Sequence, residues 1–378
     1  MANGLSEEPL SIPSLGRPFD LGTLYDCRSD KVLQGITLWD QKTLDRKKIQ
    51  KHESADFEII TSDTFEDKSS ALDINSGLKL SFLGGMLDVS GSGKYLNDRK
   101  CSNHVERVTL KYKCTTKTEK MTMEQLGKGK IEHRKVFYYC TATDVVTGIT
   151  YGGNAFFVLE KELYANSFNK NVRGNLHGMV KSIPDLKING EGKLDLSEDE
   201  KKEIRKFSCR YFGDFLPRET PSTFEEDVRL YKEMPNVIGQ KGENAVPVIV
   251  HLYPLAKLDS KACKLVREIS VVLVKDTENY LEDLYKLDVK CNDLLRSQAV
   301  NHFRGIEAEI QKFKYLLATH KLIFQRKLAQ ILPNIRGGNK EESELPMILE
   351  KKKYFSPFRT EALNSWVETK ESQVEIIL

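Results

Sequence analysis

The sequence predicts an α+β protein in which a β-rich N-terminal part is followed by an all-α C-terminal part. Before about Leu258, several segments are rich in β-branched and aromatic residues and are flanked by Gly, Asp or Pro, which is typical of strands. Beyond Asp259, apolar residues recur at steps of three and four, which indicates helices that bury one face. A chain of 378 residues is long enough for two domains, which we expect at residues 1–258 and 259–378.

The β-rich part contains five segments that we expect to form strands, with helical insertions between them. They are Arg107–Cys114, Val136–Cys140, Val145–Leu159, Phe207–Phe212 and Val246–Tyr253.

The C-terminal part is expected to be an antiparallel bundle of three or more helices. Asp259 and Ser260 are suitable caps for its start. The first helix has a stripe of Leu273, Thr277, Tyr280, Leu284, Leu287, Cys291 and Leu294. The second has Phe303, Ile306, Ile310, Phe313, Leu317, His320 and Phe324, with His320 interpreted as a core residue, and ends near Pro333, Gly337 and Gly338. A third is expected from Ser356, with Pro357 in its first position and Phe358, Leu363, Trp366 and Val374 on its buried side.

Composition argues against several classes of protein. The net charge of +3 does not form the basic footprint of a nucleic-acid-binding protein. The first residues lack the pattern of a signal peptide, and no stretch of about 18 apolar residues predicts a transmembrane helix. The seven cysteines form an odd set without paired spacing, so we expect reduced thiols.

No catalytic or metal-binding signature is found, and we expect no enzymatic activity, metal or cofactor. Gly91-Ser92-Gly93-Lys94 resembles part of a phosphate loop, but Asp88 stands where the first Gly is required and Tyr95 replaces the Ser or Thr. We interpret it as a flexible turn.

Two segments have apolar residues in alternation. Ser69–Asn97 carries Leu72, Ile74, Leu78, Leu80 and Phe82, followed by the glycines Gly84 and Gly85. Asn171–Lys206 carries Leu186, Ile188, Leu194 and Leu196. Each segment is compatible with ordinary amphipathic elements of a folded domain. Each is also long enough for two transmembrane strands of about 9 to 11 residues, and such strands would require many copies closing into a ring.

Several motifs resemble the stonustoxin and neoverrucotoxin family. They include Leu15-Gly16-Arg17-Pro18-Phe19, Leu24-Tyr25-Asp26, Gly35-Ile36-Thr37-Leu38, Lys68-Ser69-Ser70-Ala71-Leu72-Asp73-Ile74, Ser81-Phe82-Leu83-Gly84-Gly85, Lys94-Tyr95-Leu96-Asn97, Arg107-Val108-Thr109-Leu110-Lys111-Tyr112-Lys113, Tyr151-Gly152-Gly153-Asn154-Ala155-Phe156-Phe157-Val158 and Gly213-Asp214-Phe215.

The resemblance implies a MACPF/CDC-like domain, a bent central antiparallel sheet flanked by two helical clusters that unwind into transmembrane hairpins, followed by a FAT-like helical bundle. The two alternating segments fall where those clusters would lie. Gly84 and Gly85 then act as a hinge, and Tyr151 and Gly152 belong to the signature, although Gly153 and Asn154 replace the hydroxyl residue and His of the wider perforin pattern. Family chains usually continue into thioredoxin-like and PRY-SPRY domains, and this sequence ends before either.

The leading hypothesis is a pore-forming, cytolytic or haemolytic toxin-like protein that oligomerises and inserts amphipathic β-hairpins into a lipid membrane. Its expected partner is a homologous subunit in a heterodimer and higher oligomer, outside the cell at a target membrane. The alternative is a non-lytic cytoplasmic interaction or scaffold protein that retains the fold. In the first case, Asp at Leu80 or Ile188 is expected to impair lysis and to leave the soluble fold largely intact.

Overall fold

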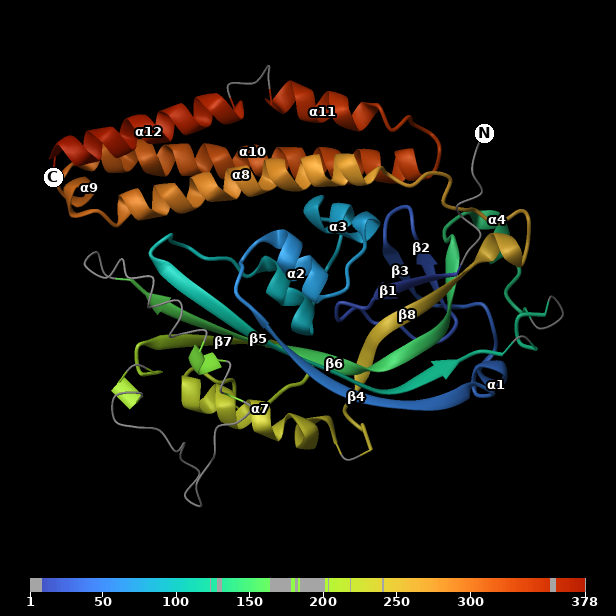
Figure 1. Cartoon of the computed structure of the whole chain (residues 1–378). Coiled ribbons are helices and arrows are strands. Elements are labelled where there is room, and N and C mark those ends of the chain that lie inside the picture. The colour runs from blue at the N-terminus through green and yellow to red at the C-terminus, as the bar shows by residue number, and fades with distance from the viewer. Residues whose placement is uncertain are drawn as a thin grey trace.

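The computed structural model describes residues 9–377, except residues 123, 128–130, 164–177, 181–182, 184–200, 203, 218, 240 and 354–357. Figure 1 shows a long bent sheet with a helical bundle lying along one of its faces. The strands are β1 (Leu10–Pro13), β2 (Thr23–Asp26), β3 (Lys31–Thr37), β4 (Lys48–Ile60), β5 (Val105–Lys120), β6 (Asp144–Glu162), β7 (Phe207–Gly213) and β8 (Val246–Pro254).

The sheet is built around β6, which pairs antiparallel with β5 along nearly its whole length. Strand β4 pairs with the far side of β5, from Lys48 opposite Lys120 to Ile60 opposite Thr109. On the same side as β5, β2 pairs with Asp144 and Val145 at the start of β6. On the other side, β6 pairs with β8 near its start and with β7 near its end. The sheet therefore contains three long neighbouring strands, β4, β5 and β6, of which β4 forms an edge, and shorter strands beside β6.

Successive residues of β6 face two different hydrophobic cores, because side chains in a strand alternate between the two faces. Phe156 and Val158 belong to the core under the helical bundle. Ala155, Phe157 and Leu159 belong to a second core, covered by α7 (Phe224–Ile238). The middle of the sheet is thus buried on both faces, which explains why the strand prediction for Val145–Leu159 is confirmed.

The C-terminal bundle contains α8 (Val271–Leu295), α9 (Gln298–His302), α10 (Arg304–Arg336), α11 (Glu344–Lys353) and α12 (Thr360–Ile377). Stacked aromatic rings join its helices. The ring centres of Phe313 and Trp366 are 4.1 Å apart, and those of His320 and Phe358 are 4.2 Å apart. His320 is buried and shares a hydrogen bond of 2.5 Å with Tyr280. The interpretation of His320 as a core residue is therefore confirmed.

Between the bundle and the sheet lie α2 (Phe65–Ala71), α3 (Ser76–Leu83) and the 3-10 helix η2 (Gly91–Asn97) (Figure 1). Buried residues of these helices, of β6 and of the bundle form one continuous hydrophobic core. The layers are therefore bundle, small helices, sheet and α7, and the small helices are covered from both sides.

Four expectations are corrected by the fold. Val136–Cys140 does not form a strand, because Val136–Tyr139 is the short helix α4, which lies in the connection between β5 and β6 and exposes Tyr138 and Tyr139. Asp259 and Ser260 do not cap a helix, since α8 begins after Ser270. Gly91–Lys94 belongs to η2, in which Ser92 and Gly93 are buried, so it is not an open turn.

The fourth correction concerns the cysteines. Cys140 and Cys263 form a disulfide with their Cα atoms 5.1 Å apart, and the remaining five cysteines are free. The two cysteines are 123 residues apart in the sequence, one after α4 and the other between β8 and α8, so their spacing alone cannot reveal the pair. Ser356 and Pro357 of the third predicted helix lie outside the described residues.

A shared core predicts that the bundle and the small helices unfold together. Leu328 of α10 is fully buried in this core, whereas Leu316 on the same helix is 40% exposed. We expect Leu328→Ala to lower the free energy of unfolding by about 2 to 5 kcal/mol and Leu316→Ala to lower it by well under about 1 kcal/mol. Urea unfolding followed by circular dichroism tests this. Two separate transitions in the unmodified chain would contradict the shared core.

Candidate membrane-insertion segment

Residues 61–104 connect β4 to its hydrogen-bonded neighbour β5 and contain α2, α3 and η2. Local capping explains why they fold as short helices. The Thr64 hydroxyl accepts the N–H of Asp67 at 3.2 Å, and the Asn75 side chain accepts the N–H of Leu78 at 2.8 Å. At the end of α3, Gly85 has φ of 69° and lets the N–H of Met86 reach the carbonyl of Ser81, which terminates the helix.

The apolar residues predicted for this segment are packed together in the structure. Leu72, Ile74, Leu78 and Leu80 are at most 6% exposed, and Phe82 is partly buried. Phe82 stacks on Phe65 with ring centres 5.5 Å apart. All five contact the core that the bundle and the sheet share, so in this state they face protein.

This burial changes the expectation for Leu80. An Asp at Leu80 would place a carboxylate in an apolar core without a partner, which costs several kcal/mol. The substitution is therefore expected to disrupt the soluble fold, contrary to what the sequence alone indicated. The residues predicted in the other segment, Leu186, Ile188, Leu194 and Leu196, lie outside the described residues.

A buried ionic cluster joins the underside of the segment to the sheet. The Lys68 ammonium lies 2.7 Å from the Asp63 carboxylate and donates to the carbonyl of Asp98. Arg107 of β5 reaches Asp63 at 2.6 Å and Asp98 at 2.9 Å. Glu160 of β6 and Arg210 of β7 complete the cluster, which then has three cations and three carboxylates. The cations are Lys68, Arg107 and Arg210, and the carboxylates are Asp63, Asp98 and Glu160.

Burial and charge act against each other in this cluster. Burial lowers the pKa of Lys68 to about 8, although the carboxylate of Asp63 opposes this change. For Asp63, burial favours the neutral form, but Lys68 and Arg107 outweigh it, so its pKa is lowered. Burial raises the pKa of Asp98 against the opposing effect of Arg107. The cluster therefore depends on all of its members remaining in contact.

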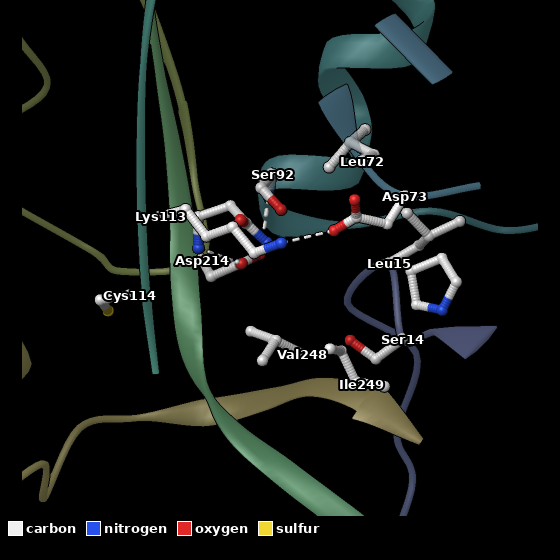
Figure 2. A pocket seen from close by; sticks show the side chains of 12 residues that line it. Ser14, Leu15, Leu72, Asp73, Ser92, Lys113, Cys114, Asp214, Val248 and Ile249 are labelled. Carbon is white, nitrogen blue, oxygen red and sulfur yellow. Dashed lines mark hydrogen bonds and ion pairs between the residues drawn. The ribbon is translucent and has the colours of Figure 1, made fainter. Parts of the chain in front are cut away.

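A second link to the sheet is made by Asp214, which follows β7. Its carboxylate accepts the N–H of Ser92 in η2 at 2.9 Å and the N–H of Asn154 in β6 at 2.8 Å. Figure 2 shows Asp214 beside Ser92, next to the ion pair that Lys113 of β5 makes with Asp73 at 2.6 Å. One partly buried carboxylate thus holds the 3-10 helix against the central strand.

The upper side of the segment is held by the bundle. Arg336 of α10 donates to the carbonyl of Gly77 and to the Ser81 hydroxyl, each at 2.8 Å, and pairs with Asp30 at 2.9 Å. Gln325 donates to the carbonyl of Leu83 at 2.8 Å.

Helix α8 holds the residues that follow η2. Glu282 pairs with Arg99 at 2.6 Å, and Asp293 accepts from Asn103 at 2.9 Å. Together with the contacts of α10, this means that residues 77–103 cannot leave the sheet unless the bundle moves.

The signature residues Tyr151 and Gly152 lie in β6, away from this interface. Gly152 is required by close packing, because a Cβ there would lie 2.0 Å from the carbonyl oxygen of Cys114 in β5. A Cβ at Gly153 would lie 2.1 Å from the ring of Phe215, so this departure from the wider perforin pattern makes room for an aromatic side chain. Tyr151 is half-buried and its ring lies 5.0 Å from the Lys117 ammonium.

The described residues contain no group of three or more His, Cys, Asp or Glu side chains arranged to hold a metal ion. In the same part of the chain, every helix is too short or too polar to cross a lipid bilayer.

The pKa of Lys68 gives a prediction about stability. Its folded value of about 8 is below its ordinary value of 10.5, so between these values the unfolded chain binds more protons and stability rises with pH. Between pH 8 and pH 10, Lys68 should add about 2 kcal/mol to the free energy of unfolding. Lys68→Met should lack this rise, whereas Lys94→Met, at an exposed position of η2, should keep it. Parallel pH profiles for wild type and Lys68→Met in urea titrations would contradict the assignment.

Comparisons with known proteins agree with this architecture. The model of the SNTX, MACPF/CDC-like domain matches residues 9–269, and that of the stonustoxin helical domain matches residues 279–375. Verrucotoxin subunit beta from Synanceia verrucosa is 37% identical over 97% of this chain and 52% of its own length. Cytolytic toxin-alpha from Scorpaena plumieri is 38% identical over 96% of this chain and 52% of its own length.

The stonustoxin structure superimposes with a TM-score of 0.76 and 31% identity, over 98% of this chain and 49% of that one. The chain spans about half the length of these relatives. The MACPF/CDC-like fold and the helical bundle expected from the sequence are confirmed. The chain therefore belongs to the stonustoxin family of MACPF/CDC-like proteins.

Proposed function

We propose that this chain is the pore-forming part of a cytolytic, toxin-like protein. It oligomerises on a membrane and inserts hairpins made from residues 61–104 and residues 163–206. In this proposal residues 1–258 supply the hairpins, and residues 259–378 cover the first of them. The observation that carries the proposal is the position of residues 61–104 between two long, paired strands, where unwinding would lengthen an existing hairpin.

The geometry of this connection favours a hairpin. Strands β4 and β5 are antiparallel neighbours, and Ile60 pairs with Thr109 close to where the connection begins and ends. Gly84 and Gly85 lie near the middle of residues 61–104 and suit the turn. Residues 72–82 form a stretch of eleven residues whose even positions are mainly apolar, as a transmembrane strand requires.

The second interval has the same relation to the sheet. Residues 163–206 connect β6 to β7, which are also antiparallel neighbours, and both intervals contain 44 residues. The predicted lipid-facing residues Leu186, Ile188, Leu194 and Leu196 belong to this interval. Equal lengths suit two hairpins that enter the same bilayer side by side.

We propose a second, homologous subunit as the partner, in a heterodimer that grows into a larger oligomer. Relatives named as alpha and beta subunits support a paired assembly. Within the described residues, β4 pairs with β5 alone and exposes most of its length. An open strand edge of this kind is able to pair with a strand of another subunit.

We propose a site of action outside the cell, at a target membrane, and no enzymatic activity. The Cys140–Cys263 disulfide supports an oxidising environment, because disulfides persist mainly in secreted proteins. The name of one relative, cytolytic toxin, supports a lytic role. The alternative of a cytoplasmic scaffold has no comparable support.

A covalent trap tests whether residues 61–104 must leave the bundle. A Cβ added at Gly84 would lie 3.4 Å from the Cβ of Leu328, which is close to the spacing of a disulfide. We expect oxidised Gly84→Cys/Leu328→Cys to release no dye from liposomes and no haemoglobin from erythrocytes, either alone or mixed with a homologous subunit. Reduction with dithiothreitol should restore release.

The single variants Gly84→Cys and Leu328→Cys, with and without dithiothreitol, are the matched controls. Equal release by the oxidised and reduced double variant would contradict insertion of this segment. No release by the unmodified chain under any pairing, with or without dithiothreitol, would favour the non-lytic scaffold instead.

A further inference from the structure

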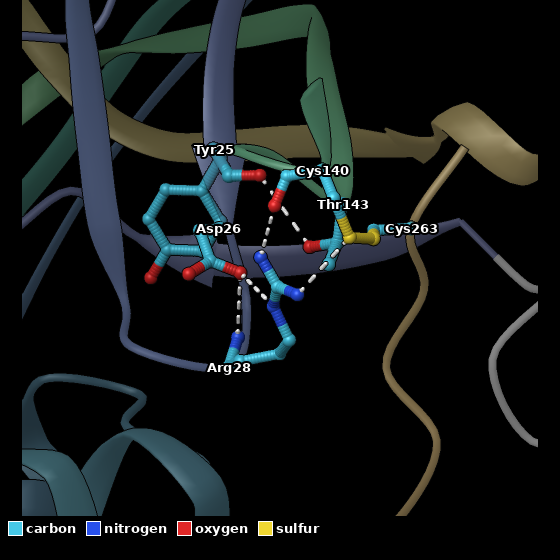
Figure 3. The surroundings of a disulfide bond; sticks show 6 residues. All are labelled: Tyr25, Asp26, Arg28, Cys140, Thr143 and Cys263. Carbon is cyan, nitrogen blue, oxygen red and sulfur yellow. Dashed lines mark hydrogen bonds and ion pairs between the residues drawn. A yellow bond between two sulfur atoms is a disulfide. The ribbon is translucent and has the colours of Figure 1, made fainter. Parts of the chain in front are cut away.

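The Cys140–Cys263 disulfide joins two parts of the fold that meet at one corner of the sheet. Cys140 follows α4 and is exposed, and Cys263 lies in the connection between β8 and α8 and is half-buried. Figure 3 shows the bond beside Arg28, whose guanidinium donates to the carbonyl of Cys140 at 2.8 Å and lies 3.6 Å from its sulfur. The bond is therefore open to solvent and lies next to the Arg28 guanidinium, which also pairs with Asp26 at 2.7 Å.

The chain beyond Cys263 is attached to the bundle. The N–H of Val266 donates to the carbonyl of Arg336 at 2.8 Å, and the N–H of Ser270 donates to Glu342 at 2.6 Å. Arg336 is the same residue that holds Gly77 and Ser81 of α3. The connection between Cys263 and α8 is therefore fixed to the same part of the bundle that covers α3.

The bond shortens the tether between sheet and bundle. Leu258 is buried in the core at the end of the sheet, and α8 begins at Val271. Without the bond, residues 259–270 set the maximum length of this tether, which is about 40 Å when they are fully extended. With it, only residues 264–270 remain, and they reach about 25 Å. The disulfide therefore restricts the distance over which the bundle can move from the sheet.

We propose that Cys140–Cys263 is a thiol-exchange site that locks the bundle over residues 61–104, and that a dithiol reductant opens it. The part that concerns membrane insertion rests on the proposed function. The lock itself concerns only the soluble chain.

The exchange is a two-electron reduction of the disulfide. A thiolate of the dithiol attacks the sulfur of Cys263, and the bond to Cys140 breaks. Cys140 leaves as a thiolate beside the Arg28 guanidinium, which stabilises it before it takes a proton. The second thiol of the reductant then displaces Cys263, so the chain gains two thiols and the reductant becomes a cyclic disulfide.

Hydrogen exchange of the soluble chain tests the lock without a membrane. We expect amides of α3, from Leu80 to Gly84, to exchange at least tenfold faster in Cys140→Ser/Cys263→Ser than in the oxidised wild type. Reduction of the wild type with dithiothreitol should give the same increase, and reoxidation should reverse it. Cys101→Ser, which removes an exposed free thiol, should exchange like the wild type.

Alkylation of the oxidised chain after unfolding in urea without a reductant, followed by mass spectrometry, should find five free thiols. Seven free thiols, or equal α3 exchange with and without the bond, would overturn the proposal. Dye release from liposomes separates the proposed lock from the proposed pore-forming function. If the α3 amides exchange faster without the disulfide but the chain releases no dye, the lock is supported and the pore-forming function is contradicted. Release by a chain whose α3 exchange is unaffected by the bond would contradict the lock alone.

Discussion

The packing of α3 between the sheet and the bundle is the constraint on which the rest of the structure depends. Leu80 is fully buried there, in a core that also includes Phe156 of the sheet and Leu328 of the bundle. Because apolar surface is covered on both sides, the small helices gain their stability from the layers around them and little from their own length. A change that separates the layers therefore removes the main reason for residues 76–83 to stay helical.

The two faces of this segment differ in how they resist separation. The bundle side combines the hydrogen bonds of Arg336 and Gln325 with a large apolar surface, whose exposure to water costs free energy in proportion to area. The sheet side contains the Lys68, Asp63, Asp98 and Arg107 cluster, whose members lost their hydration when they were buried. Water that enters beneath α2 solvates these ions again, which offsets part of the lost pairing. The ionic cluster thus positions the segment accurately and opposes its release less than an apolar surface of equal size.

Much of the architecture was predictable from the sequence, because the strands that are buried on both faces carry continuous β-branched and aromatic residues. Strand β4 was not predicted, since it lies at an edge and its residues from Lys48 to Glu58 are exposed. In α3 the burial of Leu78, Leu80, Ser81 and Leu83 leaves no single apolar stripe, so the sequence was equally compatible with a strand.

The contacts that hold the segment were not predictable, because their members come from distant parts of the chain. Arg107, Glu160 and Arg210 meet only when β5, β6 and β7 are assembled, and Asp214 reaches Ser92 across 122 residues. The same reason hides the pairing of Cys140 with Cys263. Tertiary contacts of this kind leave no periodic signal in the sequence.

The equal length of the two intervals has a consequence for the height of the molecule above a membrane. An interval of 44 residues folded at its middle gives two arms of about 21 residues, or about 70 Å when extended. The hydrocarbon layer is only about 30 Å thick. Strands in a membrane barrel are tilted by about 35–45°, so arms of this length rise by about 50 Å. In the inserted state that we propose, the sheet would stand about 20 Å above the lipid tails, and any region that recognises head groups would have to extend downward by that distance.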